Sequence, residues 1–182
     1  MRADARGNRD QIVDAALQVF REKGIDLPMK EIADRARVGV GTLYRHFPDR
    51  DALISAAAHA HLSGLADRAE AALRAEPDAW SALGRFLHEC TQDRLGAFAA
   101  AVEPALHARV RADPALTPPR TALIELIADM TAQAKADGAL RPDVTVADIA
   151  RLMTVQIYAP DADHAAGLRT TVDLLLDGLR PR

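Results

Sequence analysis

The stretch PMKEIADRARVGVGTLYRHFPDR, residues 28–50, decides the fold of this 182-residue chain. Its first half places Ile32, Ala33 and Ala36 on one face at helical spacing, while its charged residues lie on the other faces. This pattern predicts a short amphipathic helix over residues 28–37 that buries its apolar face.

A sharp turn and a second helix are expected next. Gly39 can adopt a positive φ without a Cβ clash, and Gly41 lets the backbone come close to whatever lies opposite. The second helix, residues 40–47, is expected to bury Leu43 and Phe47, which are four positions apart. Four side chains are expected to face outward, and each can donate a hydrogen bond: Thr42, Tyr44, Arg45 and His46.

Two helices joined by a glycine-containing turn of three or four residues form the helix-turn-helix geometry. In that geometry the second helix lies in the DNA major groove and the first braces it. Taken singly, each exposed polar residue fits an ordinary solvated face. The four donors gathered on one short helix favour a DNA-contacting element.

The order of residues in this stretch resembles the DNA-binding domain of the TetR family of bacterial transcriptional regulators. The matching features are a Phe-x-x-x-Gly run at residues 20–24, an Ile-Ala pair at 32–33, and Val-Gly-x-Gly-Thr-Leu-Tyr-x-His-Phe at 38–47, followed by Pro48 and Arg50. The motif covers about residues 9–56. The chain departs from the family at Pro28, where many members have Ser or Thr, and this removes a capping hydroxyl.

The resemblance implies an all-α homodimer with about nine helices per chain. A three-helix DNA-binding domain would occupy residues 1–48, and a helical body for ligand binding and dimerisation would occupy residues 49–182. It also implies phosphate contacts from Lys30, Thr42, Tyr44, His46 and Arg50. Base reading is expected from Val40 and Gly41 at the start of the second helix and from Arg45, which faces outward on the same helix.

Composition independently favours helix. Only 4% of the residues are aromatic, and Ala, Leu, Arg, Asp and Glu dominate the chain. No run approaches the 18 to 20 apolar residues of a membrane span, and the charged start lacks the apolar core of a signal peptide. A cytoplasmic protein without a membrane partner is therefore expected. The single cysteine, Cys90, excludes an intramolecular disulfide and a cysteine-based zinc cluster.

The net charge of −3 is unevenly distributed. Residues 1–50 hold ten Lys and Arg against eight Asp and Glu, whereas residues 51–182 hold thirteen against eighteen. Non-specific DNA affinity grows with the number of phosphates neutralised, so this protein is expected to depend on a few well-placed contacts. The acidic balance also suits a helical adaptor that binds another protein and no DNA, which is the alternative function.

The chain order predicts the remaining elements. Residues 2–9 show no periodicity and are expected to form a tail, either disordered or an arm that reaches DNA. A scaffold helix over residues 10–23 should end at Gly24, and Asp49 should cap a long helix reaching about residue 74. Breaks are expected at residues 76–78, 113–119 and 141–143, and Gly138 should end a strong helix.

The body is expected to bind an uncharged or weakly polar organic effector, because its apolar stripes carry few charges. Candidate lining residues, each of which also fits an ordinary core position, are Trp80, Phe86, Cys90, Leu106, Leu123, Ile127, Met130 and Met153. The last two helices are apolar over more of their circumference than one core uses. They could fill a larger bundle core, or they could meet the same helices of a second chain in a dimer interface, which the resemblance also implies. The residues expected in that interface are Ile149, Met153, Leu168, Val172, Leu175, Leu176 and Leu179.

No catalytic, cofactor or metal site is predicted, and no enzyme activity is expected. His59 and His61 diverge by about 200° around a helix, so they are poor partners for one metal. The run from His88 to Cys90 lacks the second histidine of a zinc-protease helix. The sequence therefore indicates a ligand-responsive regulator, expected to be a repressor that binds a palindromic operator in double-stranded DNA as a homodimer and is released by a small effector.

Overall fold

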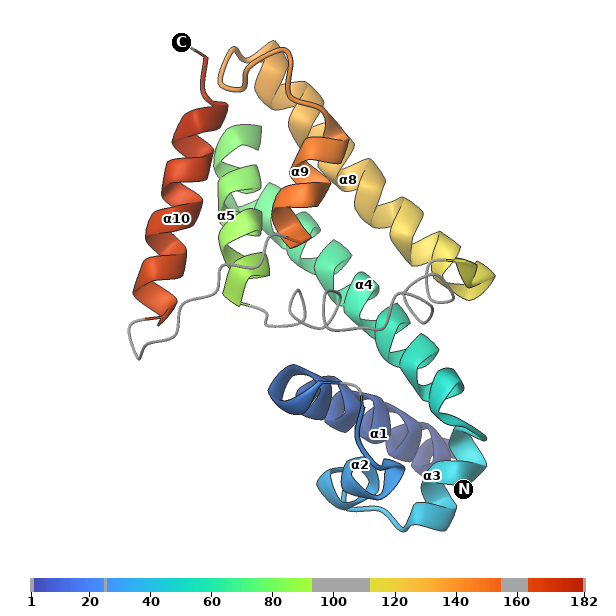
Figure 1. The fold of residues 1–182 in the computed structure, drawn as a ribbon. Coiled ribbons are helices and arrows are strands. Elements are labelled where there is room, and N and C mark those ends of the chain that lie inside the picture. Colours follow the sequence, from blue (N-terminus) through green and yellow to red (C-terminus); the bar gives the residue numbers. More distant parts are fainter. Residues whose placement is uncertain (1, 25, 93–111, 155–163, 182) are drawn as a thin grey trace. The chain divides into compact units, whose positions relative to one another are not determined.

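The computed structural model describes residues 2–24, 26–92, 112–154 and 164–181, and this part of the chain contains helices and no strand (Figure 1). It thereby confirms the all-α class. In order, the elements are α1 (Arg2–Lys23), α2 (Met29–Arg35), α3 (Val40–His46), α4 (Arg50–Ala75), α5 (Ala79–Gln92), the short 3-10 helix η1 (Pro114–Leu116), α8 (Thr117–Ala136), α9 (Val146–Thr154) and α10 (His164–Leu179). None of these helices is long and apolar enough to cross a membrane.

The described elements divide into two compact units. The first contains α1, α2, α3, the first half of α4, and η1. The second contains the rest of α4, α5, nearly all of α8, and the last two helices. Each unit is considered by itself below, and the first is called the head.

One apolar cluster holds the head together. Helix α1 packs against both α2 and α3. The cluster includes the residues predicted to be buried on the second and third helices, namely Ile32, Ala33, Ala36, Leu43 and Phe47. Burying one such aliphatic or aromatic side chain contributes about 1.5–3 kcal/mol, so the helix-turn-helix is fixed by the core behind it.

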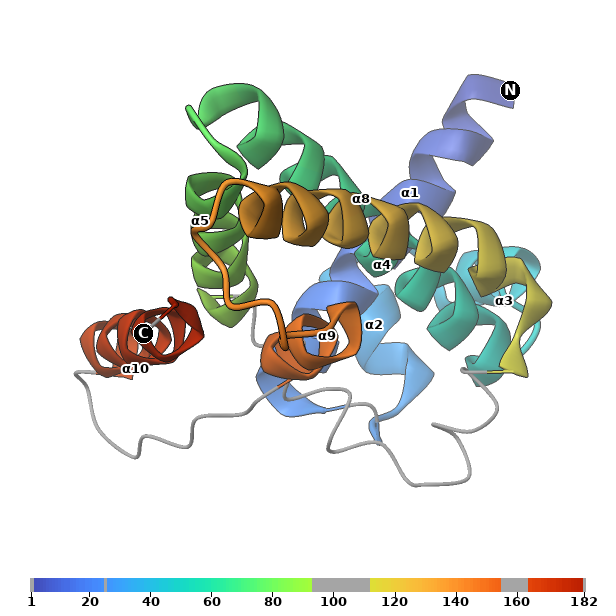
Figure 2. The same cartoon turned by 90° about the horizontal axis from the view of Figure 1, so that it is seen from above.

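Helix α1 begins earlier than the sequence predicted. Residues 2–9 were expected to form a tail, yet the helix extends from Arg2, and Figure 2 shows its first turns projecting clear of α2 and α3. The tail prediction relied on missing apolar periodicity, but Arg and Ala are strong helix formers without it. The other end was predicted correctly, because Gly24 has a φ of +81° and its N–H donates to the Phe20 carbonyl at 3.0 Å.

The turn between α2 and α3 uses a different residue from the one predicted. Gly39 has a φ of −67°, and Arg37 adopts the left-handed conformation with a φ of +53°. The N–H of Val38 donates to Ala33 at 3.0 Å and that of Arg37 donates to Asp34 at 3.1 Å, which is the Schellman pattern at a helix end. The position of the last helical turn, rather than the location of glycine, therefore decides where the backbone reverses.

Side-chain caps begin three of the described α-helices. Asp49 accepts the N–H of Ala52 at 2.8 Å, as predicted. Asp78 accepts the N–H of Ser81 at 2.7 Å, which lowers the pKa of Asp78 and starts α5 after the predicted break at residues 76–78. The third cap precedes α9, where the Thr145 N–H donates to Asp148 Oδ2 at 2.8 Å and the Asp148 N–H donates to Thr145 Oγ1 at 3.2 Å.

The loop predicted at residues 113–119 is mostly helical. Asp113 accepts the N–H of Ala115 at 2.9 Å and caps η1, after which α8 begins at Thr117. Pro118 and Pro119 thus lie in the first turn of α8, where backbone N–H groups have no partner within the helix. The prolines that indicated a loop are compatible with a helix start.

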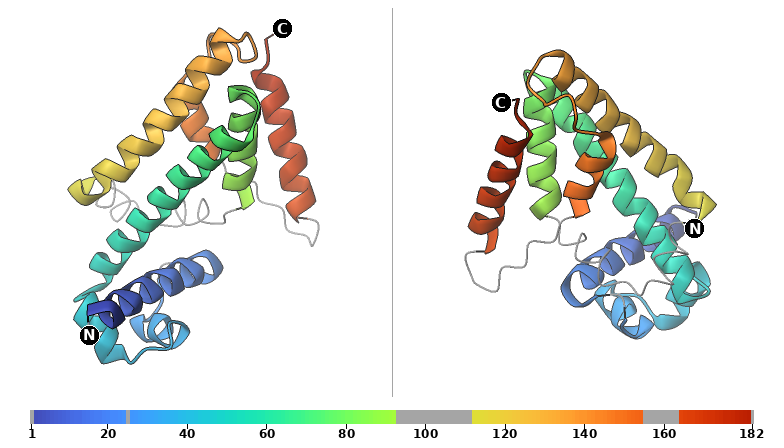
Figure 3. Two further views of the ribbon diagram at one scale, coloured as in Figure 1. Left: turned by 180° about the vertical axis from the view of Figure 1, so that it is seen from behind. Right: turned by 45° about the horizontal axis from the view of Figure 1, so that its top comes forward.

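In the second unit, α5 lies between α9 and α10, and the two views of Figure 3 agree on this arrangement. Leu176 of α10 approaches α5 closely, since its Cδ1 would lie 3.5 Å from a Cβ added at Gly84. The Arg141 backbone N–H donates to the Leu179 carbonyl at 3.0 Å, which ties the loop after α8 to the end of α10. The guanidinium of Arg180 lies 5.0 Å from the Trp80 ring centroid.

Two glycines in the second unit predict opposite effects of the same substitution. Gly138 ends α8 with a φ of +71°, so Gly138→Ala should lower the free energy of unfolding by about 1 kcal/mol. Gly64 lies within α4, and a Cβ added there meets nothing within 4 Å, so Gly64→Ala should raise it by up to about 1 kcal/mol. Urea denaturation of both variants measures the difference, and equal stability of the Gly138 variant and the wild type would contradict the left-handed helix end.

Candidate nucleic-acid interface

Helix α3 is short and depends on the head for its position. It has seven residues, and no side chain caps its first turn at Gly39. Leu43 is fully buried and Phe47 is almost fully buried, and both belong to the apolar cluster of the head. These two side chains therefore fix which face of α3 remains outside.

The outer face of α3 carries Tyr44 and Arg45. Tyr44 is 48% exposed, and Arg45 is exposed as well. Thr42 and His46 are half-buried, which is less exposed than the sequence predicted. Arg45 Nη2 donates to Thr42 Oγ1 at 2.9 Å, so a hydrogen bond between neighbouring turns orients the guanidinium.

The start of α3 exposes its backbone. Gly41 is exposed, and a Cβ added there meets no atom of the chain within 4 Å. The space beside Gly41 is therefore open to a molecule that approaches from outside. Val40 is half-buried and packs against the apolar cluster, so only part of its side chain is available to such a molecule.

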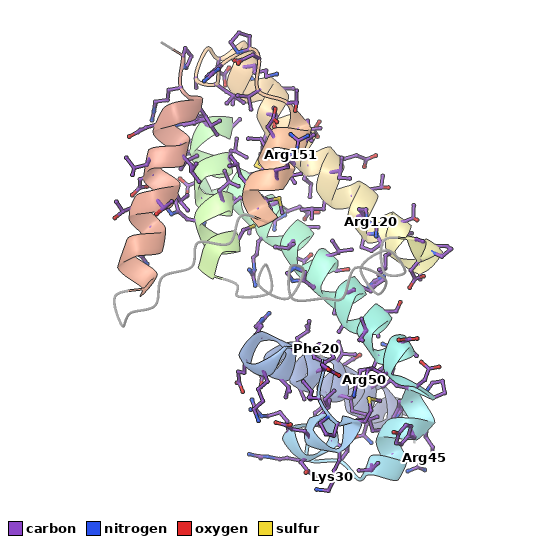
Figure 4. The ribbon with its side chains drawn as sticks, viewed as in Figure 1. Phe20, Lys30, Arg45, Arg50, Arg120 and Arg151 are labelled. Carbon is purple, nitrogen blue, oxygen red and sulfur yellow. The ribbon has the colours of Figure 1, made fainter. Side chains whose placement is uncertain are left out.

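Lys30 and Arg50 lie in different parts of the head. Figure 4 shows Lys30 and Arg45 at the edge formed by α2 and α3, with Arg50 nearer the middle of the head. Lys30 donates to Asp34 Oδ2 at 2.8 Å, and this hydrogen bond raises the pKa of the Lys30 ammonium. Arg50 donates to the Leu27 carbonyl, and its Nη1 lies 3.6 Å from Asp26 Oδ1, so it holds the segment before α2.

Two ion pairs join α1 to α2, and the residue patterns of the sequence did not predict them. Arg35 donates to both carboxylate oxygens of Glu22, at 3.0 and 2.6 Å, and the hydrogen bond lowers the pKa of Glu22. Lys23 pairs with Glu31 beside it. The first pair spans 13 residues, so only the crossing of the two helices brings it together.

A third contact that the sequence did not predict joins α1 to the end of α3. The guanidinium of Arg9 lies 5.3 Å from the centroid of the Phe47 ring. Phe47 is the residue that ends α3, so this cation–π contact connects the exposed start of α1 to the helix that carries Tyr44 and Arg45. Helical spacing could have indicated this contact, because Arg9 lies one turn before the buried Val13 and so on the same face of α1.

The predicted effector-pocket residues are mostly buried. Phe86, Cys90, Leu123, Ile127 and Met130 are buried, while Trp80 and Met153 are half-buried. Leu106 lies outside the described residues. Because core and pocket positions both predict burial, the pocket stays a prediction.

Two of the predicted dimer residues are already covered within one chain. Ile149 and Val172 are buried, so they fill the core of the second unit rather than offer surface to a partner. The side chain of Leu168 lies outside the described residues, and Met153, Leu175, Leu176 and Leu179 are half-buried. Leu174, which lies off the predicted stripe, is 67% exposed.

Within the described residues, no group of three His, Cys, Asp or Glu side chains could hold a metal ion.

A two-helix unit braced by a third helix, with an exposed tyrosine and arginine on its second helix, defines a helix-turn-helix DNA-binding protein. Residues 12–57 match the family described as "Bacterial regulatory proteins, tetR family". Residues 77–181 match the family described as "Transcriptional regulator SbtR-like, C-terminal domain". The chain belongs to the TetR family of transcriptional regulators.

Solved structures extend the similarity over nearly the whole chain. A TetR transcriptional regulator from Streptomyces coelicolor is 32% identical with a TM-score of 0.67, covering 95% of this chain and 98% of that one. A TetR transcription regulatory protein from Mycobacterium vanbaalenii is 31% identical with a TM-score of 0.67, covering 99% of each. An HTH-type transcriptional regulator from Staphylococcus aureus (strain USA300) is 44% identical over 54 residues, which are 29% of this chain and 29% of that protein. The family and the fold indicate a regulator of transcription rather than an enzyme.

The Glu22–Arg35 pair predicts a dependence of stability on pH. Because folding lowers the pKa of Glu22, the pair stabilises the fold above the ordinary pKa of about 4.5 and loses this effect as pH falls through the lower folded value. Glu22→Gln should therefore reduce stability at neutral pH and weaken its decline below about pH 4.5. Urea denaturation across this range measures both effects. Arg35→Gln and the double variant should match Glu22→Gln, whereas additive losses would contradict a shared interaction.

Proposed function

We propose that the chain is a repressor that binds a palindromic operator as a homodimer in the cytoplasm and is released by a small organic effector. Residues 1–48 would contact DNA, and residues 49–182 would bind the effector and the second chain. The observation that carries the DNA-binding part is the outer face of α3, where Tyr44 and Arg45 are exposed beside the open backbone of Gly41.

The outer face of α3 suits close contact with a groove. Without a side chain at Gly41, the start of α3 can approach the bases closely, and Arg45 can donate two hydrogen bonds to one guanine. Thr42 orients Arg45 through the hydrogen bond between them, and Val40 contributes only a partly covered apolar side chain. Direct reading of bases therefore rests mainly on Arg45, and the shape of the DNA supplies the remaining specificity.

Phosphate contacts would come from side chains around this face. The proposed residues are Lys30, Thr42, Tyr44, His46 and Arg50. Lys30 can exchange its exposed Asp34 partner for a phosphate, since an exposed ion pair contributes little. A guanidinium carries five N–H groups, so the contacts of Arg50 with Leu27 and Asp26 are compatible with a phosphate contact.

The proposed dimer places two such faces in successive major grooves, about 34 Å apart. An interface formed by α9 and α10 would use the side chains that a single chain leaves uncovered. Among the described residues, Leu174 is the most exposed large apolar side chain, and Leu175 and Leu179 on the same helix are half-buried. The buried Ile149 and Val172 would support this surface from behind.

The proposed effector is apolar or weakly polar. The buried side chains expected to surround it include Phe86, Leu123, Ile127 and Met130, none of which carries a charge. Cys90, the single cysteine of the chain, is buried as well. Trp80 is the least suited member, because Arg180 covers its ring.

Selection of bound fragments from genomic DNA tests the function, and a palindrome should be recovered.

On that operator, Tyr44→Phe should weaken binding to every sequence similarly, because it removes a phosphate contact. Arg45→Ala should cost about 1–3 kcal/mol and relax the preference at one base position in each half-site. Competition binding against operators substituted at single positions measures both variants. A changed base preference for Tyr44→Phe with unchanged affinity would reverse the two roles.

The dimer predicts a specific effect at Leu174. Leu174→Glu should weaken dimerisation by at least about tenfold, because the lost burial of a leucine corresponds to about 1.5–3 kcal/mol. The fold should be retained, since the side chain is 67% exposed. The matched control is Leu73→Glu at another exposed leucine, on α4, which should leave the dimer intact. Sedimentation measures the monomer fraction, and an unchanged dimer in the Leu174 variant would exclude this surface.

A further inference from the structure

The turn between α2 and α3 holds an arginine in a backbone conformation that residues with a side chain seldom adopt. Arg37 has a φ of +53°, and among the described residues it is the only non-glycine residue with a positive φ. The left-handed conformation brings Cβ close to the following carbonyl oxygen, so glycine is the residue that adopts it without cost. The chain therefore accepts a loss of stability at position 37 that a glycine would avoid.

Contacts within the head do not account for this arginine. Arg37 is exposed, and its backbone N–H donates to the Asp34 carbonyl, a hydrogen bond that any residue except proline can make. Seven other lysines and arginines of the head have described side chains, and each of them has a hydrogen bond, an ion pair or a ring contact. Among these described cations, the guanidinium of Arg37 alone has no such contact.

The carboxylates of α2, the helix that the turn follows, are engaged by other cations. Glu31 pairs with Lys23, and Asp34 accepts a hydrogen bond from Lys30 at 2.8 Å. The positive charge of Arg37 is therefore available to a negatively charged partner that approaches from outside the chain.

The turn lies at the edge of the head that carries the proposed DNA contacts. Figure 1 shows the connection from α2 to α3 along the lower edge of the head, where Figure 4 places Lys30 and Arg45. Arg37 comes three residues before Val40, at which α3 begins. Three residues of extended chain span at most about 11 Å, and the major groove is about 12 Å wide. Arg37 can therefore reach the strand beside the groove when the start of α3 lies within it.

We propose that Arg37 contacts a phosphate of the operator backbone from the turn, and that the chain keeps arginine at the left-handed position for this contact. The proposal rests on the function proposed above and adds a residue to the interface proposed there. Charge complementarity selects a phosphate, which is present whatever the base sequence. Stability lost in the backbone of the turn is thus exchanged for DNA affinity, as occurs with strained residues at other binding sites.

Arg37→Gly should change stability and DNA affinity in opposite directions. Glycine adopts a positive φ freely, so the melting temperature should rise by about 2–4 °C. Each phosphate contact contributes about 0.9 to the slope of log affinity against log salt, so a dimer that lacks both guanidinium groups should lose about 1.8. Thermal unfolding and salt-dependent binding of the full-length protein measure the two effects, on the operator recovered by selection and on a scrambled duplex. Because the variant is the more stable protein, weaker binding cannot arise from unfolding.

Three further variants separate the charge from the backbone conformation. Arg37→Lys should keep the wild-type slope, because lysine preserves the charge. Arg37→Asn should lower the slope as much as Arg37→Gly, because asparagine tolerates the left-handed conformation but carries no charge. Arg74→Ala is the matched control, since it removes an exposed arginine at the end of α4, outside the head, and it should keep the slope.

The two measurements can each overturn the proposal. An unchanged salt slope in Arg37→Gly and Arg37→Asn would exclude the phosphate contact, and an equal loss in Arg37→Lys would assign the effect to the shape of the turn. A melting temperature that does not rise in Arg37→Gly would mean that no stability is exchanged for affinity. If the wild-type protein yields no operator and does not bind the scrambled duplex, the proposed function has failed, and this inference fails with it.

Discussion

The burial of Leu43 and Phe47 is the constraint on which the head depends. Helix α3 has seven residues, and isolated helices shorter than about 12–15 residues are marginal in water. No side-chain cap supports its first turn, so packing against α1 and α2 supplies the stability that the local sequence lacks. The exposed positions of Tyr44 and Arg45 are consequently set by the side of α3 that is buried. A change in the core behind α3 would therefore displace the face proposed to contact DNA.

The sequence was sufficient for features that depend on neighbouring residues. Apolar spacing predicted α2 and α3, and local chemistry predicted the Asp49 cap and the glycine ends at Gly24 and Gly138. The turn before α3 was placed wrongly because its geometry depends on where α2 stops. The Schellman hydrogen bonds of Arg37 and Val38 put the left-handed residue at Arg37, two positions before the expected Gly39.

Other features could not be predicted because they require the packed arrangement of helices. The pairing of Glu22 with Arg35 depends on the crossing of α1 and α2, and the contact of Arg9 with Phe47 depends on the crossing of α1 and α3. The helical start of α1 was missed for a different reason. Amphipathic periodicity was sought in apolar residues, whereas Arg and Ala favour helix without it.

The ion pairs of the head also explain how a protein with a net charge of −3 can contact DNA. Arg35 and Lys23 pair with glutamates of the head, so these two cations stabilise the fold. Their charges are largely balanced before any DNA approaches, which limits non-specific attraction. Affinity must then depend on the few cations that the fold directs outward, as with Arg45 on α3. In the proposed dimer few contacts would hold the complex, so a small displacement of the two faces from the groove spacing would remove a large share of them. A modest difference in effector affinity between the DNA-bound and free conformations would then be enough to shift the equilibrium towards free DNA.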